Sequence, residues 1–238
     1  MRLRYDLHLH SCLSPCGDKD MTPLNLVRMA ALWAIEVIAL TDHNTVGNCR
    51  SAIAVGETVG VTVIPGMELC TSEEIHVICL FPGIEQAEAF GQMVASTLPP
   101  VKNKPKIFGE QLYMDAKDKV LGHEEILLVT ASSISIEEAP ALCRQFGGVC
   151  FPAHIDRTSY SILSALGLFP AHLGFSCAEV LPKCAIAALT AQHPPLEGLR
   201  LLRSSDAHYL DNMAEAADTI EAEQSTAAAV IAAIKRES

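Results

Sequence analysis

Histidines and carboxylates gather at the ends of short apolar runs in this chain, and two of the histidines stand close together near its start. Around His8 and His10 apolar residues alternate with polar ones, which is the pattern of a β-strand. That alternation places both imidazoles on one face, where they can chelate one metal ion. A His-x-His motif that stands alone more often marks a strand with histidines on its surface. Further candidate ligands at expected strand ends favour the metal site: Asp42, His43, Glu68, His76, His154, Asp206 and His208.

The number of histidines indicates more than one ion. Of the nine in the chain, those at positions 8, 10, 43, 76, 154 and 208 lie at expected strand ends. Imidazole combined with carboxylate suits zinc, iron or manganese. A catalytic ion keeps one coordination position open, so six imidazoles are too many for a single ion. We therefore expect two or three divalent transition-metal ions, with Glu68 as the carboxylate that bridges neighbouring ions.

Apolar strands and helices alternate along most of the chain, and the strands end in the candidate ligands. This arrangement predicts an α/β fold, a parallel and distorted (β/α)7 barrel with its metal site at the C-terminal face of the strands. The whole chain, 1–238, is expected to be one domain, with an insertion or lid at about 99–133 that has no readable pattern. The expected strands are residues 3–9, 37–40, 61–64, 75–81, 149–151, 178–181 and 199–202, and the expected helices are 22–33, 49–59, 85–98, 136–146, 159–166 and 225–235.

The amino-acid composition indicates which cellular compartment and which partners to expect. The nine cysteines are scattered without a Cys-x-x-Cys pair, which favours reduced, mostly buried thiols over a disulfide framework. No apolar run is long enough to cross a bilayer, and we expect a cytoplasmic protein with no membrane partner. The net charge of −11 leads us to expect no binding to long nucleic acid. A small phosphorylated substrate is still compatible, because a metal site sets its own local potential. The oligomeric state is left open.

Six motifs together resemble the PHP (polymerase and histidinol phosphatase) family of metallophosphoesterases. The resemblance implies a (β/α)7 barrel that holds two or three metal ions at the C-terminal face of its strands. In chain order the motifs are Asp6-Leu7-His8-Leu9-His10, Thr41-Asp42-His43, Gly66-Met67-Glu68, Ile75-His76-Val77-Ile78, Pro152-Ala153-His154 and Ser205-Asp206-Ala207-His208.

The resemblance also implies how the ligands are shared among the ions. The third site of the family takes one more Asp or His shortly beyond the His-x-His pair, where this chain has Pro15. Asp18 is the expected replacement because it is the harder ligand, and Cys16 is the alternative. Asp6 and Asp42 are expected to accept hydrogen bonds from histidine rings. The first ion would be bound by His8, His10, Glu68 and Asp206, the second by Glu68, His76 and His154, and the third by His43 and His208.

A metal-bridging hydroxide is the expected nucleophile, because metal-bound water can have a pKa near 7, against roughly 15.7 for free water. Arg157 follows His154 closely and is a candidate for binding a phosphate oxygen, although a surface arginine is an equally open interpretation. The predicted function is hydrolysis of a small phosphorylated metabolite or nucleotide. The expected catalytic residues are His8, His10, Glu68, His154, Asp206 and His208.

Other functions remain open. An exonuclease or phosphodiesterase acting on short oligonucleotides is favoured by the basic loop of Lys102, Lys104 and Lys106. Metal-dependent amide hydrolases share the His-x-His pair but usually add a bridging lysine, which this pattern lacks. A non-catalytic metal-binding or regulatory barrel is disfavoured by the complete ligand set. A cysteine-based redox or zinc-storage role has the thiols but not their spacing.

Overall fold

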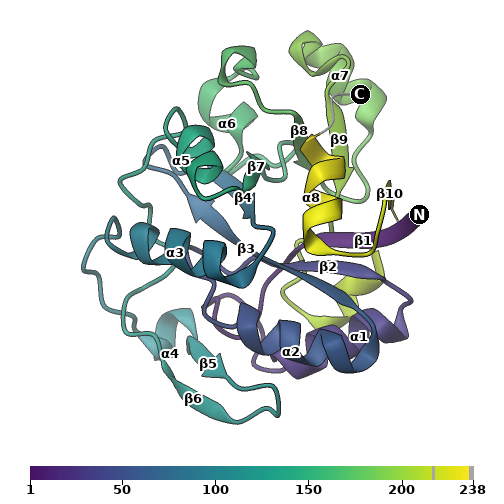
Figure 1. Cartoon of the computed structure of the whole chain (residues 1–238). Helices are drawn as coiled ribbons and strands as arrows, with labels where there is room; N and C mark the ends of the chain where they lie inside the picture. Colours follow the sequence, from purple (N-terminus) through teal and green to yellow (C-terminus); the bar gives the residue numbers. More distant parts are fainter. Residues whose placement is uncertain (216–217, 236–238) are drawn as a thin grey trace.

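A curled sheet forms the centre of the molecule (Figure 1). The computed structural model describes residues 1–215 and 218–235. Six strands are hydrogen-bonded in the order β10-β1-β2-β3-β4-β7, and β8 pairs with β9 in a separate two-stranded ladder. These elements give an α/β fold, as the sequence predicted. The strands are β1 (Arg2–Leu9), β2 (Val37–Leu40), β3 (Thr62–Cys70), β4 (His76–Leu80), β7 (Val149–Pro152), β8 (Cys177–Val180), β9 (Arg200–Arg203) and β10 (Thr219–Glu221).

The sheet is mixed, which corrects the expectation of a wholly parallel one. β1, β2 and β3 are parallel, whereas β4 is antiparallel to both β3 and β7. Only residues 71–75 connect β3 to β4, and so short a link joins antiparallel strands, not parallel ones. The reversal has a consequence for the candidate site. His76 is the first residue of β4, so it lies at the same edge of the sheet as the C-terminal end of β3.

Helices surround the sheet, and their ends follow local sequence signals. Thr22 caps α1, its side chain accepting a hydrogen bond from the Asn25 N–H at 3.2 Å, and Pro23 occupies the first helical position. Gly60 ends α2 in the left-handed conformation, with φ of 76°. No helix in these two described stretches is long and apolar enough to cross a membrane. The helices are α1 (Pro23–Leu32), α2 (Cys49–Val59), α3 (Ile84–Ala95), α4 (Pro105–Phe108), α5 (Ala139–Gln145), α6 (Ile162–Leu166), α7 (Ile186–Gln192) and α8 (Ala227–Lys235).

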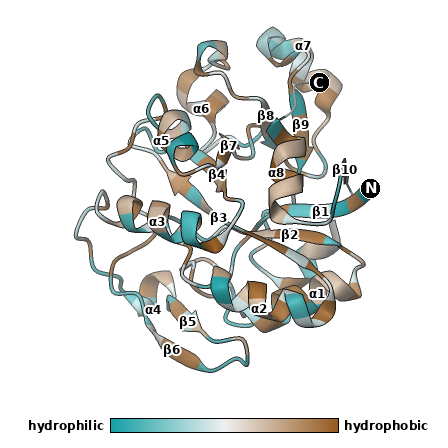
Figure 2. Ribbon diagram, viewed as in Figure 1, coloured by the Kyte–Doolittle hydropathy of each residue, from teal (hydrophilic) through white to brown (hydrophobic). Residues whose placement is uncertain are grey.

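Two apolar cores lie on the two sides of the curled sheet. The outer core joins the sheet to α1, α2, α3 and α5, and the inner core joins the strands to α8. Figure 2 shows α8 largely in the hydrophobic colours, in keeping with its burial against the strands. Leu3, Tyr5 and Leu7 of β1 belong to the inner core, whereas Leu9 belongs to the outer core. The register of β1 against β2 shifts between Asp6 and Leu9, and this irregularity leaves His8 and His10 on the inner side.

Residues 99–133 form a compact segment on the flank of the molecule. It contains α4 and a hairpin of β5 (Leu112–Met114) and β6 (Val120–His123), which lies beside α2 in Figure 1. The buried Asn44 holds this segment to the sheet. Its Nδ2 donates to the Leu128 carbonyl at 2.8 Å and to the Thr130 carbonyl at 2.9 Å, while its Oδ1 accepts from the Cys70 N–H at 2.9 Å. The segment is therefore anchored directly behind His43.

Candidate metal centre

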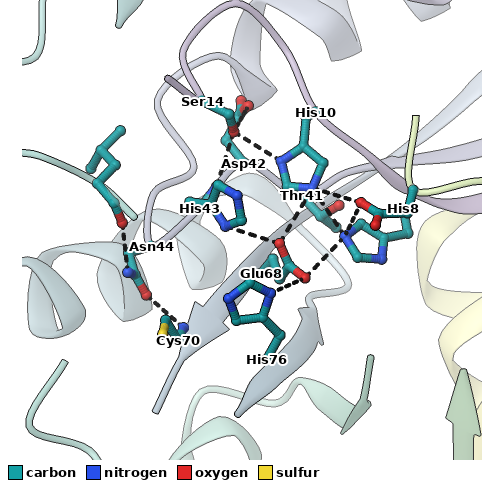
Figure 3. Close-up of polar contacts among 12 residues, drawn as sticks. His8, His10, Ser14, Thr41, Asp42, His43, Asn44, Glu68, Cys70 and His76 are labelled. Atoms are coloured by element: carbon teal, nitrogen blue, oxygen red, sulfur yellow. Dashed lines mark hydrogen bonds and ion pairs between the residues drawn. The ribbon is translucent and has the colours of Figure 1, made fainter. Parts of the chain in front are cut away.

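His8 of β1 and His10, which directly follows that strand, face each other at the inner edge of the sheet (Figure 3). Their Nε2 atoms are 3.0 Å apart, and both rings are buried. Each Nε2 also lies near the same two carboxylates. His8 Nε2 is 3.3 Å from Glu68 Oε1 and 3.2 Å from Asp206 Oδ1. His10 Nε2 is 3.3 Å from Glu68 Oε2 and 3.2 Å from Asp206 Oδ1. Four ligand-type side chains thus converge on one small volume.

Glu68 stands at the centre of the cluster and contacts histidines on both of its oxygens (Figure 3). Its Oε1 is 2.8 Å from His76 Nδ1 and 3.0 Å from His154 Nε2. Its Oε2 is 2.9 Å from His43 Nδ1. Glu68 lies on β3, and the segment carrying His43 forms a parallel bridge with it. One carboxylate therefore joins imidazoles that come from β1, β4 and the segments after β2 and β7.

The segment after β9 completes the cluster. The His208 ring stacks on His10 with ring centroids 4.2 Å apart, and its Nδ1 is 2.8 Å from the Asp206 carbonyl oxygen. His10, His43 and His208 form a second group of mutually close ligand atoms. Asp206 and His154 both have positive φ, 52° and 30°. Such backbone strain in non-glycine residues is typical of positions held by function.

Ser14 and Asp42 fix the tautomer of His10. The Ser14 hydroxyl donates to Asp42 Oδ1 at 2.7 Å, which uses its only hydrogen. It lies 2.9 Å from His10 Nδ1, so this nitrogen must be the donor between the two. The Nε2 lone pair of a neutral His10 therefore points into the cluster. Neither the motif nor its spacing marked Ser14 for this role.

Glu179 performs the same task for His8, and the sequence reasoning missed it as well. This fully buried glutamate on β8 accepts from His8 Nδ1 at 2.8 Å and from the His154 backbone N–H at 3.0 Å. It therefore positions two candidate ligands at once. The available signal was a lone acidic residue inside the apolar run Cys177-Ala178-Glu179-Val180, because a buried carboxylate needs a partner.

The two aspartates expected to accept hydrogen bonds from histidine rings accept them directly from serines instead. Asp6 accepts hydrogen bonds from the backbone N–H and the hydroxyl of Ser205, the former at 3.0 Å. Asp42 accepts from Ser11 and Ser14, so it reaches the His10 ring only through a hydroxyl. Both carboxylates therefore fix the loops that carry the ligands. Burial raises the pKa of Asp6 to about 6.

For Glu68 and His8, burial and the neighbouring charged groups shift the pKa in opposite directions. Desolvation alone would raise the pKa of Glu68, yet His76, His8 and His43 hold it well below its ordinary value. Desolvation would likewise lower the pKa of His8, but Glu179, Asp206 and Glu68 raise it. His208 behaves in the opposite way, because burial and the neighbouring His10 lower its pKa to about 3. The carboxylates of the cluster thus favour protonation of His8, and the imidazoles favour ionisation of Glu68.

The donor set fits divalent metal ions. With the outer N–H groups of His8 and His10 already committed to Glu179 and Ser14, two Nε2 lone pairs face each other and face carboxylate oxygens. Acceptors at such distances repel unless a cation lies among them. Among the described residues, Glu68 Oε2 and Asp206 Oδ1 accept no hydrogen bond. Imidazole and carboxylate are also the ligands that divalent transition metals prefer. The cluster therefore has the donor set of a divalent metal site.

Asp18 and Cys16, the two candidates for the third-site ligand, differ in their contacts. Asp18 is half-buried, and its Oδ1 accepts from the Asp20 N–H at 2.9 Å, an ordinary turn contact. It is absent from the groups of close ligand atoms found in the described parts of the chain. The exposed Cys16 instead forms a hydrogen bond with the His43 ring. Burial lowers the pKa of His43, but Glu68 and this hydrogen bond raise it, and the net shift is upward.

The turn after β7 places two further side chains beside the cluster. Arg157 points inward and its Nη2 is 2.7 Å from Asp206 Oδ2, which places a cation beside the candidate ligands. Tyr160 lies against His76, with the two rings stacked at 4.8 Å. The basic loop is separate from the cluster. Its Lys102 is close to Glu125 at the surface of the segment 99–133.

Comparison with known proteins relates the chain to phosphoesterases. No family model matches it. It is 36% identical over 83 residues to a 5′-3′ exoribonuclease of Haemophilus influenzae, covering 34% of this chain and 29% of that protein. It is 32% identical over 99 residues to a phosphoribosyl 1,2-cyclic phosphate 1,2-diphosphodiesterase of Eggerthella lenta, covering 39% of this chain and 36% of that protein. The chain thus matches about a third of the length of these relatives.

Solved structures show the same fold. The lesion-specific endonuclease EndoQ of Pyrococcus furiosus superposes with a TM-score of 0.67 at 17% identity, over 99% of this chain and 56% of EndoQ. A metal-dependent phosphoesterase structure from Bifidobacterium adolescentis gives 0.58 at 17% identity, over 86% and 87% of the two chains. The predicted resemblance to the PHP family is confirmed. The shared fold brings residues that are distant in sequence to one edge of the sheet.

The expectation, drawn from the net charge, that the chain binds no long nucleic acid is contradicted by proteins similar to it. One solved neighbour is Endonuclease Q in complex with a 27-mer duplex that carries an abasic lesion at the active site, with a TM-score of 0.62 to this chain. A relative by sequence is an exoribonuclease. The inference failed because net charge describes the whole surface, whereas the field at a metal site is set by the ions and the groups around them.

Proposed function

We propose that the chain is a metal-dependent phosphoesterase whose catalytic centre is the histidine–carboxylate cluster around Glu68. The single observation that carries this proposal is the placement of Glu68, which contacts imidazoles from four separate segments while His8 and His10 face it with locked tautomers. Divalent ions bound there would supply positive charge for a phosphate group and lower the pKa of a water molecule. The names of the relatives are consistent with this chemistry.

The ligands would be shared among three positions. Glu68 and Asp206, together with His8 and His10, would hold the first ion, as their distances of 3.2–3.3 Å allow. The second would lie between Glu68 Oε1, His76 and His154. Zinc, manganese and iron all suit these ligands. For the third position we propose His43, His208 and the Cys16 thiolate, because Cys16 forms a hydrogen bond with the His43 ring, whereas Asp18 lies outside the groups of close ligand atoms among the described residues.

The third position gives a spectroscopic prediction. Thiolate bound to Co²⁺ produces charge-transfer absorption that nitrogen and oxygen ligands do not. Cobalt-loaded wild type should show this band in the near-ultraviolet, Cys16→Ser should lose it, and Asp18→Ala should keep it. Titration of cobalt into each protein, followed by absorbance, makes the measurement. A band that survives in Cys16→Ser would remove Cys16 from the metal centre.

The chain's own residues would orient the substrate. Arg157 lies beside Asp206 with its side chain 41% exposed, so it can turn from that carboxylate to a phosphate oxygen. Glu179, Ser14 and Asp42 would hold the ligand rings and so keep the ions in fixed positions. The PHP-type fold itself would be a distorted (β/α)7 barrel in which β7, β8 and β9 continue the sheet back to β1. The bridge between Leu9 and Ala207 supports that closure. The chain would form one domain, with residues 99–133 as its insertion.

The substrate would be a small phosphorylated compound or a nucleotide, and cleavage at the end of an oligonucleotide is the second candidate, favoured by the exoribonuclease relative. The test is hydrolysis of a panel of phosphomonoesters, nucleotides and oligonucleotides by zinc-loaded and manganese-loaded protein. We expect phosphate release that chelator abolishes and added metal restores. Absence of hydrolysis across the panel with at least two ions bound per chain would refute the proposal.

A further inference from the structure

Tyr160 combines three features that an ordinary surface tyrosine does not share. Its ring stacks on His76 with centroids 4.8 Å apart and an interplanar angle of 24°. The residue is 49% exposed, so part of the ring is open to solvent. Its backbone has φ of 54°, a left-handed conformation that costs roughly 1–2 kcal/mol for a residue with a Cβ. An exposed aromatic side chain alone needs no explanation, but one in a strained backbone beside a candidate metal ligand does.

The position of Tyr160 is fixed from both sides. Its carbonyl oxygen accepts a hydrogen bond from the His76 N–H at 2.9 Å, which ties the turn to the first residue of β4. The next residue, Ser161, is fully buried, caps α6 through the Ser164 N–H at 3.2 Å and donates to the Arg157 carbonyl at 2.7 Å. The exposed ring is therefore presented by a rigid turn, and binding to it would cost little ordering of the protein.

The same turn carries all three kinds of group that a nucleotide needs. His154 begins it and contacts Glu68 at 3.0 Å, and Arg157 reaches Asp206 at 2.7 Å. Tyr160 follows with its ring against His76, which itself contacts Glu68 at 2.8 Å. A phosphate bound at the ions and Arg157 would thus have an aromatic face within reach of the group it esterifies. Aromatic side chains beside a phosphate site bind nucleobases by stacking, whatever the base.

We propose that Tyr160 is a base-stacking platform, and that the phosphoesters this site prefers carry a nucleobase next to the cleaved phosphate. The inference rests on the proposed phosphoesterase function and narrows it to nucleotides or nucleotide ends of a strand. Tyr160 would act on substrate positioning, so its effect should appear in KM more than in kcat. A sugar phosphate without a base would gain nothing from the platform.

The test compares substrates that differ only in the base. Hydrolysis of AMP and of ribose 5-phosphate is measured for metal-loaded wild type, Tyr160→Ala and Tyr160→Phe. We expect wild type to prefer AMP by about tenfold in kcat/KM, Tyr160→Ala to lose that preference through a higher KM for AMP, and Tyr160→Phe to keep it. Trp33→Ala removes another half-exposed aromatic residue, at the end of α1, and should leave the preference unchanged. Binding of a non-hydrolysable phosphonate analogue of AMP gives the same comparison without turnover.

The outcomes are separable. An equal loss on both substrates in Tyr160→Ala would mean that the ring only supports His76, and the stacking proposal would be overturned. Equal rates on both substrates in wild type would also overturn it, while the phosphoesterase function would stand. If wild type hydrolysed no phosphoester, the function itself would fail. A dinucleotide cleaved with the same dependence on Tyr160 would assign the platform to strand ends, and a dependence confined to AMP would assign it to free nucleotides.

Discussion

Replacing Glu68 by glutamine should remove most of the bound metal and nearly all phosphoesterase activity. Among the described residues, Glu68 is the carboxylate in contact with His43, His76 and His154 together, and its charge balances them in a buried site. The amide of glutamine has one oxygen and no charge, so it can neither bridge two ions nor neutralise them. Loss of several kcal/mol of charge stabilisation corresponds to a fall of about a thousandfold or more in kcat/KM.

Elemental analysis after metal loading and dialysis measures the first effect. Wild type should hold at least two ions per chain and Glu68→Gln less than one, with circular dichroism showing that both are folded. Glu88→Gln is the matched control, because Glu88 forms an ion pair with Arg50 at the surface and this pair includes no residue of the cluster. A Glu68→Gln protein that retained two ions would show that the cluster is not held together by this bridge.

The candidate site could be predicted because its ligands are strand-end residues. Val37–Leu40 is wholly apolar and buried, and the polar Asp42 and His43 follow it at once, so the sequence marks where the strand delivers them. The same signal surrounds Glu68 and His154. Strand periodicity also paired His8 with His10, although strict alternation did not foresee the irregularity that turns Leu9 to the outer core. The class of fold followed from these repeated units.

Features set by long-range contact were beyond the sequence. The direction of β4 depends on the short turn after β3 and on pairing with β7, which lies seventy residues further on. β10 (Thr219–Glu221) adds antiparallel to β1 at the far end of the chain, and its few residues carry no clear pattern. The contact of Ser14 with Asp42 likewise arises only when the segments after β1 and β2 meet. The net charge led to the wrong expectation about nucleic acid for a related reason, because a total of −11 does not say where the charges lie on the surface.

Replacing Glu179 by leucine should weaken metal binding although Glu179 is not itself expected to bind an ion. Its Oε1 accepts from the His8 ring at 2.8 Å and from the His154 backbone at 3.0 Å, in a fully buried place. Leucine would leave both donors unpaired, free the His8 ring to rotate and allow its other tautomer. Loss of such an outer partner typically costs about 10–100-fold in metal affinity. Each buried donor left unpaired costs about 1–3 kcal/mol of stability as well.

Competition with a chromogenic chelator gives the zinc affinity, and urea unfolding of the metal-free protein gives the stability. Glu179→Gln separates the two parts of the role, because its amide oxygen can still accept both hydrogen bonds while the charge is gone. We expect it to bind zinc more tightly than Glu179→Leu and less tightly than wild type. Glu137→Leu is the control, since Glu137 forms a glutamate–histidine pair with His172 at 2.9 Å, but both side chains are exposed. Wild-type zinc affinity in Glu179→Leu would mean that the His8 ring is held by its metal alone.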